Sequence, residues 1–562
     1  MKNQKWNLAP GDVTGEETLA QEGIPALTAR ILCARGATTG ALAARFLEKG
    51  EELLQDPMGM KDMDKAVARI EKALKDGEKI AVFGDYDVDG ITSTCLLTHY
   101  LRGRGGYVRP YIPNRLDEGY GISREAVAFL HEKGITLMVT VDCGITAVEE
   151  TQYAAELGMD VVITDHHECK DVLPPAVAVV DPHRRDCDYP FTELAGVGVA
   201  LKLVMALGGA AQFTEYVDLA AIGTVADVMQ ITGENRAIVA IGLAQLSPSK
   251  RPGLRALLRE AGVEGKPVTT VTIGYSLAPR LNAAGRMGQA EVAARLILTE
   301  DEGQAQGLAQ QLCDLNRERQ NVEGGICEGC MEALDREPSL AQYAIVMSGS
   351  DWHQGVVGIV ASRLAEKYGA PAFMICVQDG KGKGSCRSYG NLNLFEALEA
   401  CSDLLLGFGG HALAAGFTIL EENIPAFREK MKDYVKGHQN ADGSFAGLEV
   451  DAVLPDASLL NEKEIVALDV LEPHGTGNPK PVLAILGGRV TYLSEVGGGR
   501  HLKLKVRVGS CLLDAIYFST NLADTELTVG DKVDVAFSPQ INEFRGNRTV
   551  QMQICDVRRA GA

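Results

Sequence analysis

Three aspartates alternate within residues 84–90, at Asp85, Asp87 and Asp89. Carboxylates this close repel one another unless a cation lies between them, so the spacing indicates a metal site. A calcium loop of the EF-hand type is one alternative, but it requires Glu at the twelfth position, which is Leu96 here. A helix-capping role would account for one of the aspartates and not for three.

Further carboxylate and imidazole side chains occur after apolar stretches elsewhere in the chain. They are Asp142, Asp165, His166, His167 and Asp227. Mixed Asp and His ligands suit manganese or magnesium with some imidazole, or zinc. Because the carboxylates outnumber the ligands that one ion needs, we expect two divalent cations about 3.5–4 Å apart that clamp the attacking and leaving oxygens of a phosphoryl group.

The elements that position these residues are predicted to form a doubly wound parallel sheet. Apolar runs at 79–83, 137–141, 161–164 and 176–180 are typical of buried strands, and helical stretches lie between several of them. Each run ends at a polar residue or cluster. In such sheets the ligand site lies outside the carboxyl ends of the strands, which is where these clusters are placed.

The chain of 562 residues is long enough for about three to five domains. Residues 1–75 are predicted to be a helical N-terminal segment, and 76–230 the parallel-sheet domain. Residues 231–340 read as a helical connector, 341–440 as a second α/β domain, and 447–562 as a small antiparallel barrel or sandwich of short alternating strands. The predicted fold class is therefore multidomain α/β with a C-terminal β-barrel.

Several motifs identify a family resemblance. The segments GDYDVDGITST, VDCG, TDHHE and GTVADV resemble the four motifs of the DHH phosphoesterase superfamily. Within it, the segments ARILCARGATT, PNRLDEGYG, APRLNAAGRM, WHQGVVGIVASRL and GGHALAAGF resemble the RecJ exonucleases, over nearly the whole chain. The resemblance implies that 76–230 is a DHH catalytic domain, 341–440 a DHH-associated substrate-binding domain, and 447–562 an OB-fold nucleic-acid-binding domain.

The resemblance also implies roles for the polar cluster. The positions that match metal ligands are Asp87, Asp89, Asp142, His166 and Asp227. Asp85 and His167 match accompanying catalytic positions, where His167 orients the site or stabilises the scissile phosphate. Smaller relatives often carry His at the position of Phe83, and the sequence leaves open whether Asp85 replaces that ligand.

Arginines within Gly-rich turns are candidates for holding a terminal phosphate, because a guanidinium offers a planar fork of donors. The resemblance implies that Arg115, one of Arg280 and Arg286, Ser385 and Arg387 contact the 5′ phosphate of the substrate. Gly409, Gly410 and His411 are predicted to form a turn that leads into a helix, which would be a further anion site.

The overall charge speaks against a generally basic surface, since 75 Asp and Glu outnumber 55 Lys and Arg to give a net charge of −20. From residue 480 onward the balance reverses, with 11 Lys and Arg against 8 Asp and Glu. Aromatic rings alternate with cations in this stretch, so its rings could stack on bases or fill the barrel core. The rings are Tyr492, Tyr517, Phe518, Phe537 and Phe544; the cations are Arg500, Lys503, Lys505, Arg507, Arg545 and Arg548.

No signal peptide or membrane-spanning run is visible, and the 13 cysteines are scattered, so we expect a cytoplasmic protein with free thiols. The single C-x-x-C at Cys327 and Cys330 is treated as chance spacing.

The resemblance implies a metal-dependent 5′→3′ exonuclease that hydrolyses single-stranded DNA to 5′ mononucleotides, with two Mn²⁺ or Mg²⁺ ions, in DNA repair and recombination. Single-strand-binding protein and a helicase are possible partners. Two alternatives stay open. A small-substrate DHH phosphodiesterase is disfavoured by the length of the chain, and a non-catalytic replication factor is disfavoured because the Asp and His ligands are all present.

Overall fold

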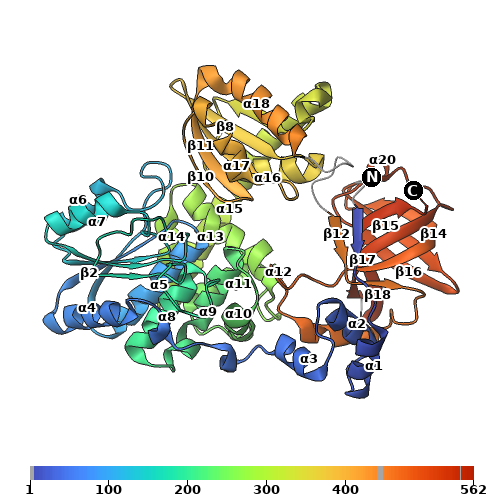
Figure 1. Cartoon of the computed structure of the whole chain (residues 1–562), viewed down its shortest axis with the longest axis horizontal. Coiled ribbons are helices and arrows are strands. Elements are labelled where there is room, and N and C mark those ends of the chain that lie inside the picture. Colours follow the sequence, from blue (N-terminus) through green and yellow to red (C-terminus); the bar gives the residue numbers. More distant parts are fainter. Residues whose placement is uncertain (1–4, 439–446, 545, 562) are drawn as a thin grey trace.

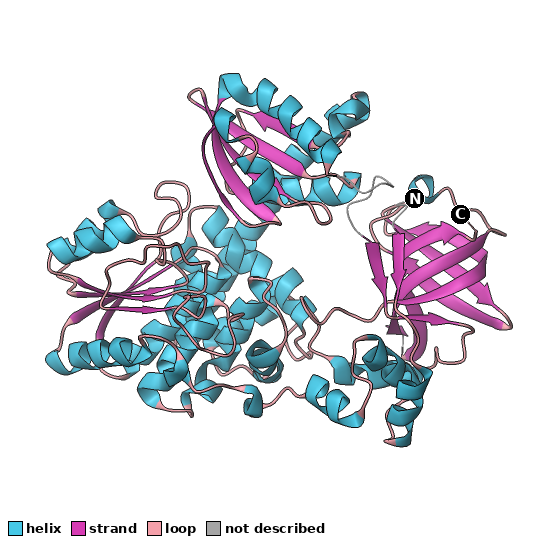
Figure 2. Ribbon diagram, viewed as in Figure 1, coloured by secondary structure: helices cyan, strands magenta, loops and turns pink. Residues whose placement is uncertain are grey.

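The structure is a computed structural model that describes residues 5–438, 447–544 and 546–561. Arg545 and residues 439–440 of the predicted second α/β domain lie outside the described residues, as does the side chain of Phe544. Figures 1 and 2 show three β-containing bodies, with a group of helices beside the parallel sheet and the first and last described strands both at the C-terminal barrel.

The parallel-sheet domain has the predicted architecture. Its strands run in the order β3-β2-β4-β5-β6, all parallel, and helices cover both faces. Ile80 and Val82 enter one hydrophobic core and Ala81 and Phe83 enter another, because successive strand residues point to opposite faces. The elements are β2 (Lys79–Gly84), β3 (Tyr107–Tyr111), β4 (Leu137–Val141), β5 (Asp160–Thr164), β6 (Ala178–Val180), α4 (Met63–Asp76), α5 (Val88–Gly103), α6 (Arg124–Glu132), α7 (Val148–Glu156), α8 (Gly196–Gly208) and α9 (Gln212–Ala226).

The connector is helical, as predicted, and its helices share the larger core of the parallel-sheet domain. Its last helix, α15, has 35 residues and continues into contact with the second α/β domain. The helices are α10 (Gly233–Leu246), α11 (Pro252–Glu260), α12 (Thr270–Thr272), α13 (Ala278–Arg286), α14 (Ala290–Leu298) and α15 (Glu302–Arg336).

The second α/β domain is a mixed sheet in the order β10-β11-β9-β8-β7, with helices packed against it. One prediction is wrong here: Gly409 and Gly410 are not a turn into a helix but the end of β10, and the turn that begins at His411 joins β10 to β11 in a hairpin. The alternating Phe417 and Ile419 bury one face of β11, which favours a strand. The elements are β7 (Ile345–Gly349), α16 (Val357–Tyr368), β8 (Ala372–Gln378), β9 (Lys381–Arg387), α17 (Leu394–Glu399), β10 (Leu405–Gly410), β11 (Ala414–Leu420) and α18 (Ile424–Gly437).

The C-terminal strands form a closed barrel, because β14 pairs with both β15 and β17. Phe537 is fully buried and therefore belongs to the barrel core, whereas Tyr492 and Phe518 are 44% and 46% exposed. The elements are β12 (Gly447–Val450), β13 (Ala452–Leu454), α19 (Glu462–Ala467), β14 (Leu483–Val496), β15 (His501–Val508), β16 (Cys511–Tyr517), α20 (Leu522–Thr525), β17 (Lys532–Phe544) and β18 (Asn547–Arg559).

The N-terminal segment packs against the opposite end of the chain. Its first described element is a strand, β1 (Lys5–Leu8), which pairs with β12 in parallel. Helices α1 (Val13–Gln21), α2 (Ala26–Ala34) and α3 (Gly40–Leu47) share a hydrophobic core with the barrel (Figure 1). The 13 cysteines are unpaired, and across the described ranges no helix combines the length and apolarity needed to span a bilayer.

Candidate active site

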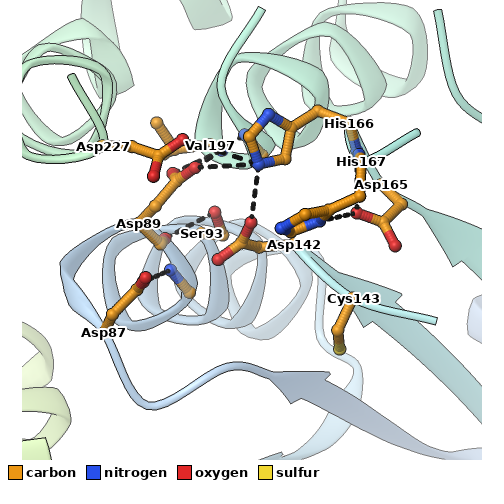
Figure 3. Close-up of polar contacts among 12 residues, drawn as sticks. Asp87, Asp89, Ser93, Asp142, Cys143, Asp165, His166, His167, Val197 and Asp227 are labelled. Carbon is orange, nitrogen blue, oxygen red and sulfur yellow. Dashed lines mark hydrogen bonds and ion pairs between the residues drawn. The ribbon is translucent and has the colours of Figure 1, made fainter. Parts of the chain in front are cut away.

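The carboxyl edge of the parallel sheet gathers the polar cluster (Figure 3). Asp85 follows β2, Asp142 follows β4, and the run from Asp165 to His167 follows β5. Parallel strands end at one edge of their sheet, so these side chains meet although up to 82 residues separate them.

Two helices bring the remaining acidic groups to the same edge. Asp87 is the N-cap of α5 and accepts a hydrogen bond from the Gly90 N–H at 3.0 Å, while Asp89 lies in the first turn of that helix. Asp227 is the C-cap residue of α9. These positions are helix ends rather than strand ends, so they depend on how α5 and α9 pack against the sheet.

His166 lies at the centre of the cluster. Its Nε2 is 3.1 Å from Asp142 Oδ1, 3.6 Å from Asp227 Oδ2 and 3.8 Å from Asp89 Oδ2 (Figure 3). Burial, together with the charge of neighbouring His167, lowers the pKa of His166 to about 3. The imidazole is therefore neutral at physiological pH, which is the form that coordinates a metal.

Asp89 is oriented by the start of α8. Its carboxylate accepts hydrogen bonds from the Gly196 and Val197 N–H groups at 2.7 and 2.8 Å. Gly196 has no room for a side chain, because an added Cβ would lie 2.5 Å from the Asp142 Cβ. Sequence reasoning missed this supporting role, although the Gly-rich stretch 194–200 is its visible signal.

Asp165, which the sequence placed in the polar cluster without a role of its own, is a second supporting residue. It is fully buried and accepts hydrogen bonds from the Ile145 N–H at 2.9 Å and the His166 N–H at 2.8 Å. Its Oδ1 also lies 2.7 Å from His167 Nδ1. Burial acts to lower the pKa of His167, but the bond and charge of Asp165 outweigh it and raise that pKa to about 9. In the metal-free protein this favours the protonated imidazole, a form suited to stabilise phosphate charge.

The donor set fits divalent cations. Three groups of side chains each place their ligand atoms within 4.8 Å of one another: Asp142 with His166 and His167, Asp89 with His166 and Asp227, and Asp85 with Asp87 and Asp142. Burial, and then the repulsion of neighbouring carboxylates, raises the pKa values of Asp85, Asp142 and Asp227 well above the ordinary range. Among the described residues, the buried Asp85 Oδ1 has no hydrogen-bond partner. A bound cation would offset the repulsion between the carboxylates and would give Asp85 Oδ1 a partner. Asp85 lies within ligand range of Asp87 and Asp142, whereas Phe83 has no ligand atom.

The same crowding predicts how metal removal changes stability. Burial, and then the charge of Asp87, raises the pKa of Asp89 from 3.8 to about 7. This carboxyl group therefore lowers the free energy of unfolding of the metal-free protein by about 3 kcal/mol as pH rises from 4 to 7. We expect the melting temperature in chelator to increase from pH 8 to pH 6.5, and saturating Mn²⁺ to reduce that difference. An unchanged difference with Mn²⁺ would contradict this account.

The carboxylates and imidazole that could hold cations are called the metal-ligand cluster below: Asp85, Asp87, Asp89, Asp142, His166 and Asp227. Beside it, Arg115, Arg286 and Arg387 form what we call the arginine cluster. Arg115 lies 4.8 Å from the centre of the Tyr86 ring, Arg286 donates to the Gly355 carbonyl at 3.1 Å, and Arg387 donates to the Cys386 carbonyl at 2.8 Å. Burial, and then the charges of Arg115 and Arg387, lowers the pKa of Arg286 to about 9. Within the described part of the chain none of the three has a carboxylate partner within 4.0 Å. The cluster is therefore suited to an anion.

Other predicted phosphate contacts differ in their surroundings. Ser385 Oγ lies 3.5 Å from Arg387 Nη1 and so belongs beside the cluster. Arg280 instead donates to the Ser276 carbonyl at 2.6 Å and contacts Cys313 Sγ at 3.3 Å, within the connector. His411 is exposed at the tip of the β10–β11 hairpin.

Comparison with known proteins assigns a family to this arrangement. Residues 79–224 match the DHH family N-terminal domain, 340–437 the DHHA1 domain, and 450–556 the RecJ OB domain. Relatives named single-stranded-DNA-specific exonuclease RecJ are 38% identical in Bacillus subtilis (98% of this chain, 70% of the relative) and 35% identical in Escherichia coli (95% and 96%). The chain belongs to the RecJ family.

Solved RecJ structures agree with this assignment. The Mn²⁺ complex of RecJ from Thermus thermophilus is 33% identical and superimposes with a TM-score of 0.85, over 100% of this chain and 81% of that one. The Mg²⁺ complex from the same organism is 32% identical, with a TM-score of 0.80 over 100% and 80%. The predicted family and fold class, including the DHH, DHH-associated and OB domains, are confirmed, and divalent metal use agrees with the RecJ complexes.

Proposed function

We propose that this RecJ-family chain is a divalent-metal-dependent exonuclease that hydrolyses single-stranded DNA from the 5′ end and releases 5′ mononucleotides. The observation that carries the proposal is that the metal-ligand cluster and the arginine cluster share one loop. Asp85, Asp87 and Asp89 supply carboxylates, while Tyr86 of the same loop contacts Arg115. Gly285 packs against this loop too, since a Cβ added there would lie 2.1 Å from the Tyr86 carbonyl.

The arginine cluster explains attack at an end. A terminal phosphate carries more negative charge than an internal phosphodiester and exposes more oxygens, so unpaired guanidinium groups bind it in preference. Arg115, Arg286, Arg387 and Ser385 would hold that phosphate. The next phosphodiester would then lie at the metal-ligand cluster, so that each cut would release one nucleotide.

The metal-ligand residues would supply the hydrolytic centre. Asp87, Asp89, Asp142, His166 and Asp227 would hold the cations, with Asp85 as a further carboxylate in range. When bound, such ions lower the pKa of water and offset the charge that develops on the phosphate. Asp165 orients the His167 ring through the bond at Nδ1, so His167 would stabilise the charge on a phosphate oxygen. Neutral His166 is held among three carboxylates as a ligand.

The barrel would hold the strand beyond the site. Tyr492 and Phe518 expose their rings for base stacking, and Lys503 and Arg507 are exposed cations on β15. Such an enzyme would serve DNA repair and recombination in the cytoplasm. There, single-strand-binding protein and a helicase would present single strands to it.

The experiment uses 5′-phosphorylated oligonucleotides that carry a label at either end, with Mn²⁺ or with chelator. With a 5′ label we expect labelled mononucleotide from the first time points, and with a 3′ label a ladder that shortens gradually. A duplex of the same sequence and a 5′-phosphorylated dinucleotide serve as comparisons, which separate the small-substrate alternative. Early release of a 3′-labelled mononucleotide would refute the proposed polarity.

A further inference from the structure

Helix α15 runs from the connector to the second α/β domain (Figure 1) and contributes to a hydrophobic core in each. Leu312 and Leu315 pack in the core shared by the parallel-sheet domain and the connector, whereas Val322 and Cys327 pack in a core of the second α/β domain. At the crossing, α15 carries three polar side chains at spacings of three and four residues, which places them on one face. They are Asn316, Arg319 and Glu323.

Glu323 has no exposed surface, and its two oxygens engage guanidinium groups from two helices. Arg319 of the same helix donates to Glu323 Oε2 and also to Asn316 Oδ1, the latter at 2.7 Å. Arg363 of α16 forms an ion pair with Glu323 Oε1, its Nε lying 2.5 Å away, although among the described residues this oxygen accepts no hydrogen bond. Removing one member of a buried ionic group is costly, because it leaves another charge uncompensated. Glu323 thus links α15 to α16 through ion pairs with Arg319 and Arg363.

The start of α16 lies next to the arginine cluster. Gly358, in its first turn, lies so close to β9 that an added Cβ would be 2.8 Å from Ser385 Oγ and 3.3 Å from Arg387 Nη2. Gly355, just before the helix, accepts the hydrogen bond from Arg286. Arg286 belongs to the connector and Arg387 to the second α/β domain, so α16 and the residues that lead into it contact arginines from two domains.

Helix α15 reaches the same cluster from the other side. It packs against α13, the helix that ends at Arg286. The charge of Arg319 is also among those that act on Arg286, after burial and the charges of Arg115 and Arg387. The separation of Arg286 and Arg387 therefore depends on how α15 and α16 are held together.

We propose that Glu323 is a positioning residue that joins α15 to α16 and thereby sets the spacing between Arg286 and Arg387 for a terminal phosphate. This inference rests on the proposed function. Glu323 touches neither substrate nor metal in this scheme. Its effect is confined to the two domains that each contribute an arginine, so it governs the preference for a phosphorylated 5′ end and not the hydrolytic step.

The test compares 5′-phosphorylated and 5′-hydroxyl single strands of one sequence. In Glu323→Gln we expect KM for the phosphorylated strand to rise about tenfold, because small misplacements of binding groups cost this much or more. We expect kcat to change less than about threefold, and KM for the 5′-hydroxyl strand to stay constant. Arg363→Gln removes the α16 partner and should act in the same direction, with less risk to folding because the Arg363 side chain is 56% exposed. Glu328→Gln, an exposed carboxylate on α15, is the matched control and should behave as wild type.

Equal rises in KM for both strands, or no change in either variant, would overturn the role of Glu323. If Glu323→Gln fails to fold, the result with Arg363→Gln decides. A wild-type enzyme indifferent to the 5′ phosphate would instead refute the phosphate site of the proposed function, and that outcome is read from the wild type alone.

Discussion

Replacing Asp89 by asparagine should lower the rate of single-strand hydrolysis by at least about 10³-fold, since metal ions contribute several kcal/mol to such reactions and about 4 kcal/mol corresponds to that factor. Asp89 faces His166 Nε2 at 3.8 Å and belongs to a ligand group with His166 and Asp227. Asparagine keeps the size and one of the two oxygens that accept hydrogen bonds from the start of α8, but it loses the other acceptor and the charge that attracts a cation. The measurement is initial rate on a 5′-phosphorylated strand across a range of Mn²⁺ concentrations.

Thermal unfolding separates loss of metal from loss of fold. Without metal, Asp89→Asn should melt at a higher temperature than wild type near pH 8, because it removes a carboxylate that neighbouring acids repel. Mn²⁺ should stabilise it less than it stabilises wild type. Asp218→Asn is the matched control. Asp218 is a buried aspartate on α9 whose carboxylate lies 2.9 Å from Arg251 Nε, and it belongs to none of the ligand groups. Near-normal activity in Asp89→Asn would show that the metal-site assignment is wrong.

Replacing Arg387 by glutamine should raise KM for a 5′-phosphorylated strand by about 10–100-fold, which corresponds to the 1.5–3 kcal/mol of a hydrogen bond to a charged group. The 5′-hydroxyl strand should be affected far less, because it lacks the terminal phosphate. Arg387→Lys keeps the charge but loses the planar fork, so an intermediate KM is expected. Steady-state kinetics on both strands provide the measurement.

The free protein offers an independent readout of the arginine cluster. Burial, and then the like charges of Arg115 and Arg387, lowers the pKa of Arg286, so the three cations repel one another in the free protein. Removing the Arg387 charge should therefore stabilise the unliganded protein while it weakens phosphate binding. Arg280→Gln is the control, since the bonds of Arg280 lie within the connector. A similar KM increase in Arg280→Gln would contradict the choice of Arg286 over Arg280.

Much of the fold could be predicted because local patterns carry it. The alternation that sends Ile80 and Val82 to one core and Ala81 and Phe83 to another is a property of any strand covered on both faces. Local pattern is also why the prediction at residues 409–416 is wrong. Glycines permit both a helix start and a tight turn, and only pairing with β9 selects the strand.

For the candidate site, residue type and position in the sequence were enough to predict the metal ligands. They were not enough to predict the residues that orient those ligands. Asp165 is adjacent to His166 in the chain, yet its bond to the Ile145 N–H depends on the neighbouring strand. Glu323 stands in a helix with many charged residues, and nothing in that pattern distinguishes a buried carboxylate from an exposed one such as Glu328.

The sequence by itself determined the chemistry: carboxylates and imidazoles at the ends of parallel strands must meet at one edge, and they need cations to do so. Only the tertiary structure decided which arginines share a site, that the first helices pack on the barrel, and that α15 and α16 are joined through Glu323. The reason is distance along the chain. Strand and helix periodicity reports the burial of a segment over a few residues, whereas Arg286 and Arg387 are brought together by packing between domains.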